Sequence, residues 1–131
     1  MILLDTSALI RWICVPEKLS KQAEKTIDAA IKQGEVLISS ISVWEICLLI
    51  KKGRLDFFID PNTWLAKIES MPSVKFVPVD NAVAVQSVNL PDFSHKDPAD
   101  RIIIATAREY GATLITSDKR ILNYKHVRTL Q

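Results

Sequence analysis

The 131-residue sequence predicts a three-layer α/β/α sandwich around a central, mostly parallel sheet. Three short runs of Leu, Ile and Val do not alternate with polar residues, which indicates strands buried on both faces. Segments with helical features separate these runs and provide the long connections that parallel strands require. The chain contains no internal repeat, low-complexity segment or obvious linker, so we expect a single domain over residues 1–131.

The predicted strands are identified by their apolar composition and their length. The runs MILLD, EVLISS and ATLITSD occupy residues 1–5, 35–40 and 112–118. A fourth segment, VKFVPVD at 74–80, alternates between apolar and polar residues and contains a proline. Proline has no backbone N–H to donate within a sheet, so this segment is predicted to be an edge strand.

The predicted helices are bounded by residues that commonly start or end helices. Gly34, Gly53 and Gly111 each follow a helical segment, as glycine often does at the C′ position. Pro61 lies near the start of another segment, where its missing N–H has no cost. The expected helices span residues 6–13, 18–34, 42–53, 60–71, 80–90 and 97–111.

Composition excludes some classes of protein. No apolar run approaches the roughly 18 residues of a membrane span, and residues 1–5 read as a strand rather than as a secretory signal. We therefore expect a cytoplasmic protein with no membrane segment. Cys14 and Cys47 lie in apolar, helix-like segments, which predicts buried free thiols in a reducing compartment.

Charge is informative mainly through its distribution. The formal net charge of +2 does not indicate a dedicated nucleic-acid binder. Basic residues nevertheless cluster at 51–54 and again at 119–128. Such clusters are usually solvated faces, and phosphate binding is the alternative.

Acidic residues occur where strands end and helices begin. Asp5 and Asp118 end two of the predicted strands, and Glu45 and Asp100 lie in the first turns of predicted helices. In a parallel sheet, strand carboxyl ends and the helix N-termini that follow them share one edge, where ligands bind. Four carboxylates are therefore expected to face one crevice.

Each acid also has a purely structural explanation. Asp5 and Asp118 are suitable helix caps, and Ser42 to Glu45 forms an S-x-x-E capping box, with Ile41 and Ile46 as its hydrophobic staple. In the next such segment, Asp97 is a suitable N-cap, Pro98 fits N1, and Asp100 at N3 complements the helix dipole. Each cap would stabilise the fold by about 1 kcal/mol.

The four acids together favour a metal site over four separate caps. Like charges at such short separations cannot all remain ionised without a counter-charge. Mg²⁺ or Mn²⁺ is suited to an all-oxygen site, and the sequence has no His or Cys cluster with zinc spacing. A metal held there promotes hydrolysis of a phosphodiester by in-line attack of water. The neighbouring hydroxyls either orient these groups or cap helices: Thr6, Ser7, Thr116 and Ser117.

Four sequence blocks resemble the PIN-domain family, and more narrowly the VapC-type toxins of prokaryotic toxin–antitoxin pairs. The blocks are MILLDTSALIRWI, SSISVWEICLLIKKGRL, HKDPADRIIIATA and LITSDKRI. The resemblance implies a Rossmann-like domain and an Mg²⁺- or Mn²⁺-dependent ribonuclease. It assigns the catalytic, metal-binding set to Asp5, Glu45, Asp100 and Asp118. Supporting positions are Thr6, Thr116, Ser117, Asp97, which reaches metal only indirectly, and Arg101, which contacts phosphate or pairs with an acid.

The resemblance also implies partners. Such toxins form homodimers, cleave RNA and are silenced by a cognate VapB-type antitoxin, whose tail lies in a hydrophobic groove. Trp12, Trp44 and Trp64 are candidates to line that groove, although at least two of them are expected to be core residues. The sequence leaves open which RNA is cut, at which sequence, and with how many metal ions.

Rival functions remain to be distinguished. Haloacid-dehalogenase-like phosphatases need a D-x-D motif after the first strand, and LLDTSA has no second acid. Receiver domains need an acid pair and a later lysine that are not found. A non-catalytic PIN-like protein that binds RNA or an antitoxin is the alternative, and the complete set of four acids argues against it.

Overall fold

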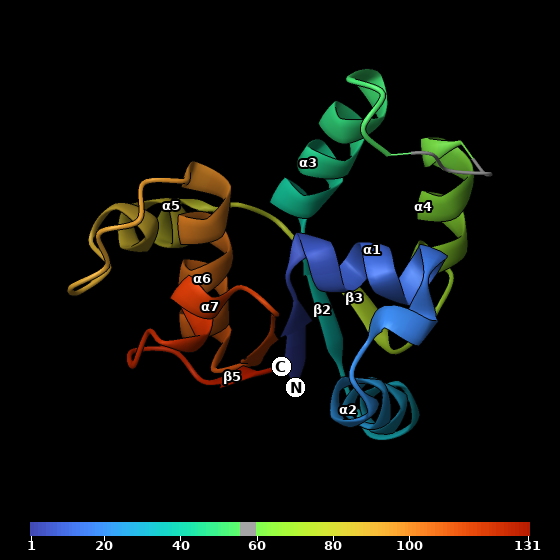
Figure 1. The fold of residues 1–131 in the computed structure, drawn as a ribbon, viewed down its shortest axis with the longest axis horizontal. Coiled ribbons are helices and arrows are strands. Elements are labelled where there is room, and N and C mark those ends of the chain that lie inside the picture. Colours follow the sequence, from blue (N-terminus) through green and yellow to red (C-terminus); the bar gives the residue numbers. More distant parts are fainter. Residues whose placement is uncertain (56–59) are drawn as a thin grey trace.

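The computed structural model describes residues 1–55 and 60–131 and has the predicted α/β/α architecture (Figure 1). The strands of the central sheet are all parallel and follow the order β3-β2-β1-β4-β5. They are β1 (Ile2–Leu4), β2 (Val36–Ser39), β3 (Val74–Val77), β4 (Thr113–Ile115) and β5 (Thr129–Leu130).

The first strand is the centre of the sheet, and its register fixes where the strands end. Leu4 pairs with Ile38 of β2 on one side and with Ile115 of β4 on the other. All three strands therefore end at nearly the same level. The predicted edge position of residues 74–77 is confirmed, whereas the short strand β5 at the opposite edge was not predicted.

Helices cover both faces of the sheet. In Figure 1, α1, α2 and α4 lie on one side and α5, α6 and α7 on the other, while α3 rises from the end of β2. Their bounds are α1 Thr6–Cys14, α2 Lys21–Gln33, α3 Ser40–Lys51, α4 Pro61–Glu69, α5 Asn81–Val88, α6 Pro98–Tyr110 and α7 Lys119–Leu122, with a 3₁₀ turn η1 at Pro16–Lys18.

Two hydrophobic clusters hold the layers together, one on each face of the sheet. Successive residues of a strand point to opposite faces. Accordingly, Ile2 and Leu4 pack with α1, α2 and α4, while Leu3 packs with α5 and α6. This two-sided burial explains why the strands are continuously apolar in sequence.

Both ends of α6 have the capping residues that the sequence predicted. Asp97 is its N-cap and accepts a hydrogen bond from the backbone N–H of Asp100 at 3.0 Å, with Pro98 at the first helical position. Gly111 ends the helix at φ 64°, a left-handed conformation that glycine adopts without strain.

The predicted capping box of α3 is wrong. Strand β2 runs directly into the helix, so Ser39 is the N-cap and accepts from the N–H of Ile41. Ser42 therefore lies inside the first turn and is completely buried. Ile41 and Ile46 do not form a staple either, because they pack in the two different hydrophobic clusters.

The predicted burial of the cysteines is also wrong. Cys14 and Cys47 are both exposed free thiols, because each lies on the outer side of its helix. Among the described helices, none has both the length and the apolarity needed to span a bilayer.

Candidate active site

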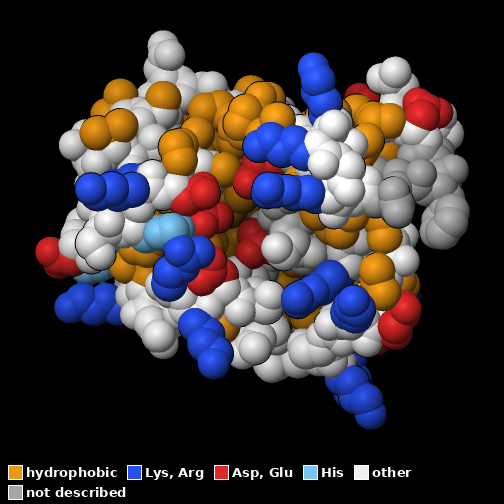
Figure 2. All heavy atoms as spheres, turned by 45° about the horizontal axis from the view of Figure 1, so that its top comes forward, with side chains coloured by type: hydrophobic (Ala, Val, Ile, Leu, Met, Phe, Trp, Pro, Cys, Tyr) orange, Lys and Arg blue, Asp and Glu red, His pale blue; other side chains and the backbone are white. Residues whose placement is uncertain are grey.

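The four acids selected from the sequence line one hollow at the carboxyl edge of the sheet. This hollow has a volume of about 320 Å³ and is bordered by Asp5, Thr6, Ser7, Ile10, Glu45, Leu49, Asp100, Ser117 and Asp118. Figure 2 shows acidic side chains gathered in the middle of this face, with a histidine beside them and Lys and Arg side chains around them.

Asp5 is placed by the central strand and is the most deeply buried of the four acids. Its backbone N–H bonds to the carbonyl of Ile115 at 3.1 Å, which extends the pairing of β1 with β4. Its side chain is the N-cap of α1, accepting from the N–H of Ala8 at 2.7 Å. The residue is only 7% exposed, and burial raises its pKa. A hydrogen bond from Thr116 and the charge of Arg11 oppose that rise.

Glu45 is oriented by the hydroxyl group of Thr6, and no cation of the described residues pairs with it. Thr6 Oγ1 donates to Glu45 Oε1 at 2.5 Å, and the same hydroxyl lies 2.9 Å from the buried Ser42 Oγ. Ser42 and Glu45 are three residues apart on α3 and so share the helix face that meets α1. Burial raises the pKa of Glu45, and nearby Asp100 adds to the rise.

Asp100 lies in the first turn of α6, as predicted, and contacts a histidine. His95 Nε2 is 3.0 Å from Asp100 Oδ2. Burial raises the pKa of Asp100, the hydrogen bond from His95 lowers it, and the charge of Asp97 raises it further. Ligand atoms of His95, Asp97 and Asp100 lie within 4.8 Å of one another, so they form a candidate metal-holding group.

Asp118 differs from the other acids because it has a strong cationic partner. Arg120 Nη2 lies 2.8 Å from Asp118 Oδ2, and Arg120 Nε lies 3.2 Å from Oδ1. These bonds lower the pKa of Asp118. Asp118 is also the N-cap of α7, accepting from the backbone N–H of Arg120 at 2.9 Å.

The supporting residues have different positions. Thr116 is buried, and its Oγ1 accepts from the N–H of Asp118 at 3.1 Å. Ser117 lines the hollow and accepts from Arg11 Nη1 at 3.0 Å. Both hydroxyls therefore stabilise the loop after β4 at the site.

Arg101 bonds to backbone carbonyls and does not pair with an acid of the described residues. Its guanidinium donates to the backbone carbonyls of Ser87, Val88, Phe93 and His95. It forms no ion pair with an acid among residues 1–55 and 60–131. Arg101 therefore fastens the loop that carries His95 to the start of α6.

The electrostatics of the hollow favour a cation. Three of its four carboxyls have raised pKa values, with burial as the largest cause and mutual repulsion as a contribution. Within the described chain, Asp5 and Glu45 have no basic group within ion-pair distance. The donors are carboxylate oxygens, with one imidazole at the edge. This donor set fits a hard divalent ion.

Two side chains beside these acids were not selected from the sequence. His95 bridges Asp100 and Arg120, since its Nδ1 lies 3.0 Å from Arg120 Nη1. Arg120 in turn bonds to Asp118 and lies 3.8 Å from Asp100 Oδ2. Both residues lie within five positions of a predicted acid, and that proximity was the available signal. Their side-chain directions depend on how loop 89–97 meets α7, which no periodic pattern shows.

A family model confirms the relationship suggested by the four sequence blocks. The model of the PIN domain matches residues 2–127. The chain belongs to the PIN-domain family. This PIN domain is also 34% identical over 127 residues to Ribonuclease VapC22 of Mycobacterium tuberculosis, covering 97% of the present chain and 94% of that protein. The predicted VapC-type relationship is thereby confirmed.

Solved structures confirm the fold of this PIN domain. A toxin–antitoxin complex from Klebsiella pneumoniae contains a chain with a TM-score of 0.67 and 21% identity, covering 100% of this chain and 97% of that one. VapBC2 from Rickettsia felis, bound to a DNA fragment from its promoter, gives a TM-score of 0.72 and 17% identity, with coverages of 99% and 98%. At these identities the similarity establishes the architecture.

Proposed function

We propose that this protein is a metal-dependent endoribonuclease and the toxin of a VapBC-type toxin–antitoxin pair. One observation carries the proposal: residues 5, 45, 100 and 118, which lie far apart in sequence, border a single hollow. The relative named Ribonuclease VapC22 supports RNA as the substrate class.

The acids would hold Mg²⁺ or Mn²⁺, with Asp5 and Glu45 as the pair that lacks a protein cation. A divalent ion bound there supplies the positive charge that stabilises the phosphodiester oxygens and promotes the ionisation of an attacking water. Thr6 keeps one Glu45 oxygen fixed through its 2.5 Å hydrogen bond. Thr116 and the N–H of Ala8 orient the Asp5 carboxyl in the same way. Preorganised carboxylates of this kind do not need to reorient during the reaction.

The test is RNA cleavage by the purified, antitoxin-free protein. We expect cutting of total cellular RNA with Mg²⁺ or Mn²⁺, no cutting with EDTA, and no cutting by the Asp5→Asn variant. Asp28→Asn is the matched control because it removes an exposed carboxylate from α2. A panel of RNAs left intact by the wild-type protein with either metal would refute the nuclease.

The alternative is a non-catalytic PIN protein that binds RNA or an antitoxin. The same experiment separates the two functions when binding is measured as well. In the alternative, Asp5→Asn and the wild-type protein would bind equally and neither would cut.

The antitoxin is proposed to dock in an apolar hollow between α1 and α4. This hollow of about 210 Å³ is lined by Trp12, Ile13, Trp64, Lys67, Ile68 and Met71. Trp64 is buried in the core and Trp12 is partly buried against it, whereas Trp44 is 58% exposed and lies on α3. Met71→Glu should weaken capture by the antitoxin without changing RNA cleavage.

We also propose a homodimer. Val85 and Val88 on α5 are 63% and 75% exposed, and they are one helical turn apart on the same face. Exposed large apolar side chains in this arrangement are typical of contact surfaces. Light scattering of the wild-type protein and Val88→Glu should show a dimer and a monomer, respectively.

A further inference from the structure

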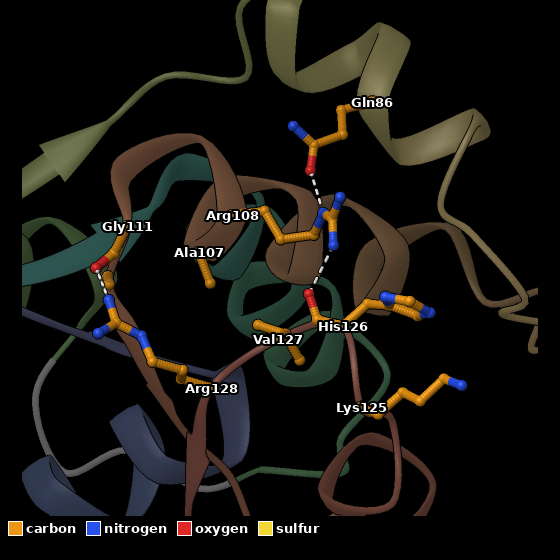
Figure 3. A pocket seen from close by; sticks show the side chains of 9 residues that line it. Gln86, Ala107, Arg108, Gly111, Lys125, His126, Val127 and Arg128 are labelled. Atoms are coloured by element: carbon orange, nitrogen blue, oxygen red, sulfur yellow. Dashed lines mark hydrogen bonds between the residues drawn. The ribbon is translucent and has the colours of Figure 1, made fainter.

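A second hollow lies at the other end of α6 and is lined by basic residues. Its volume is about 430 Å³ (Figure 3). Gln86 of α5 and Arg108 of α6 form one wall, and the segment leading into β5 forms the other. The basic side chains in the lining are Arg108, Lys125, His126 and Arg128, and we call this cavity the basic hollow.

Neutral groups, not carboxylates, hold the two arginines of the basic hollow. Arg108 Nε donates to Gln86 Oε1 at 2.5 Å, and its Nη1 donates to the carbonyl of His126 at 2.5 Å. Arg128 Nη2 donates to the carbonyl of Gly111. Figure 3 shows these bonds, which join Arg108 to Gln86 and His126 and Arg128 to Gly111. These bonds therefore fix the positions of both arginines, and neither forms an ion pair with a carboxylate of the described residues.

The negative charge near the basic hollow is smaller than the positive charge. Arg108, Lys125 and Arg128 form no ion pair in the part of the chain that the structure describes. Gln86, which accepts from Arg108, also donates through Nε2 to Glu109 Oε1 at 2.5 Å, and Asp92 Oδ2 lies 3.9 Å from His126 Nε2. The C-terminus of α6 adds roughly half a negative charge. Three permanent cations exceed these charges, and Arg108 Nη2 and Lys125 Nζ also retain donors without a hydrogen bond to the described residues.

A third hollow has lining residues that contact the acids on one side and the basic hollow on the other. It has a volume of about 310 Å³ and is lined by His95, Arg120, the partly exposed Phe93, the buried Tyr124 and one acid, Asp92, among others. At one end, His95 and Arg120 contact Asp100 and Asp118. At the other, the ring of Tyr124 lies 5.4 Å from the ring of His126. Cations and aromatic rings together are the groups that bind a single nucleic-acid strand.

We propose that the basic hollow binds backbone phosphates of the RNA strand whose scissile bond lies at the acids. This inference rests on the proposed ribonuclease function. Arg108 is eight residues after Asp100 on α6, so the two ends of the path are separated by about 12 Å along the helix. That distance equals about four stacked nucleotides at a rise of ~3.4 Å each. Phosphates several nucleotides from the cut would therefore reach the basic hollow.

The test measures RNA binding in an Asp5→Asn background, in which the RNA is not cut. The test variant is Lys125→Gln with Arg128→Gln. The control is Lys21→Gln with Lys32→Gln, which removes two exposed charges from α2 on the other side of the sheet. We expect the test variant to bind a long single-stranded RNA about tenfold more weakly, with a salt-dependence slope lower by about 1.4, while the control is unchanged. A trinucleotide is too short to reach from the acids to the basic hollow, so it should bind all of these proteins equally.

Additional variants separate charge from folding. Arg128→Lys keeps the charge and should retain most of the affinity, and Lys125→Gln alone removes a side chain that holds no other part of the described structure. Equal affinity and equal salt slopes for the test and control variants would overturn the inference, even if the wild-type protein cuts RNA. Loss of binding in the test variant, combined with no cutting by the wild-type protein, would refute the nuclease and retain the phosphate site.

Discussion

Arg120 holds both carboxylate oxygens of Asp118, with Nη2 2.8 Å from Oδ2 and Nε 3.2 Å from Oδ1. The same guanidinium lies 3.8 Å from Asp100 Oδ2. The protein thus places a cation of its own beside Asp118 and Asp100. That cation is mostly exposed and belongs to a flexible side chain, so it can be displaced.

Removing this cation should strengthen metal binding. A divalent ion at the proposed site would use the same Asp118 oxygens as Arg120, so Arg120→Gln should lower the Kd for Mn²⁺ several-fold in calorimetry. The metal-free variant should also melt at a lower temperature than the wild-type protein near neutral pH. In this variant the Arg120 charge no longer offsets the repulsion between the carboxylates of Asp118 and Asp100. Lys119→Gln is the control. Weaker Mn²⁺ binding by Arg120→Gln would show that the arginine supports the site instead of competing for it.

Asp5→Asn should stabilise the metal-free protein while abolishing cleavage. The Asp5 carboxyl is buried and its raised pKa reflects the cost of its charge. The amide removes that charge and can still accept from the N–H of Ala8. Thermal melting in EDTA should therefore give a higher Tm for the variant, and added Mn²⁺ should raise the Tm of the wild-type protein more. A variant with lower Tm in EDTA would contradict this account of the site.

The stability of the metal-free protein should fall as pH rises from about 4 toward neutrality. Asp5, Glu45 and Asp100 have raised pKa values, so in this window the folded state holds protons that the unfolded state has released. The free energy of unfolding therefore decreases as pH rises and these three carboxyls must ionise in the folded state. Asp118 has a lowered pKa, so its ionised carboxylate stabilises the folded protein throughout this pH range. That stabilisation is lost only at lower pH, as Asp118 becomes protonated.

The measurement that isolates this effect is the difference in unfolding free energy between the wild-type protein and Asp5→Asn, taken at several pH values in EDTA. We expect the variant's advantage to grow with pH and to disappear when Mn²⁺ is present. An advantage that does not change with pH would mean that the Asp5 carboxyl ionises normally.

Substitutions of Asp97 and Asp100 should have different effects, because Asp97 caps a helix and Asp100 is proposed to act in cleavage. Asp97 caps α6 and is exposed, so Asp97→Ala should reduce stability by about 1 kcal/mol and leave most of the cleavage activity. Asp100→Asn should leave the cap intact and abolish cleavage. Urea unfolding and RNA cleavage of both variants provide the comparison. Full activity in Asp100→Asn would return this residue to a purely structural role.

Thr6 should act by positioning Glu45. Thr6→Val removes the hydroxyl that bonds to Glu45 and Ser42, whereas Thr6→Ser retains it. Losing a group that orients a metal ligand typically costs about 10- to 100-fold in activity or metal affinity. We expect that loss in cleavage and in Mn²⁺ affinity for Thr6→Val, with recovery in Thr6→Ser. Equal loss in both variants would assign the effect to packing.

The sequence was most informative where one residue's position depends on local structure. The buried strands were recognisable because residues 2–4, 36–39 and 113–115 are apolar on both faces. The predicted strand ends indicated one edge for both acids: Asp5 directly follows β1, whereas β4 ends at Ile115 and Asp118 lies three residues further, as the N-cap of α7. The cap of α6 was predicted because its N-cap, proline and terminal glycine act within one or two turns.

Features that depend on contacts distant in sequence were not predictable in this way. Ser42 fits a capping box by spacing, but the direct join of β2 to α3 moved the cap to Ser39. Cys14 and Cys47 lie in apolar segments, yet the side that faces the core depends on neighbouring helices. Strand β5 has only two residues, and its pairing with Leu114 and Ile115 comes from β4 rather than from its own pattern.

The position of β1 has a consequence for synthesis of the chain. Strand β1 pairs with β4, which is translated more than a hundred residues after it. Asp5 is thus held at the edge of the sheet by Ile115, and Asp118 reaches the hollow only through the same strand. A ribosome must therefore translate the chain as far as Asp118 before the four acids can meet. While the nascent chain is being translated, the RNA around it faces a site that has not yet been assembled.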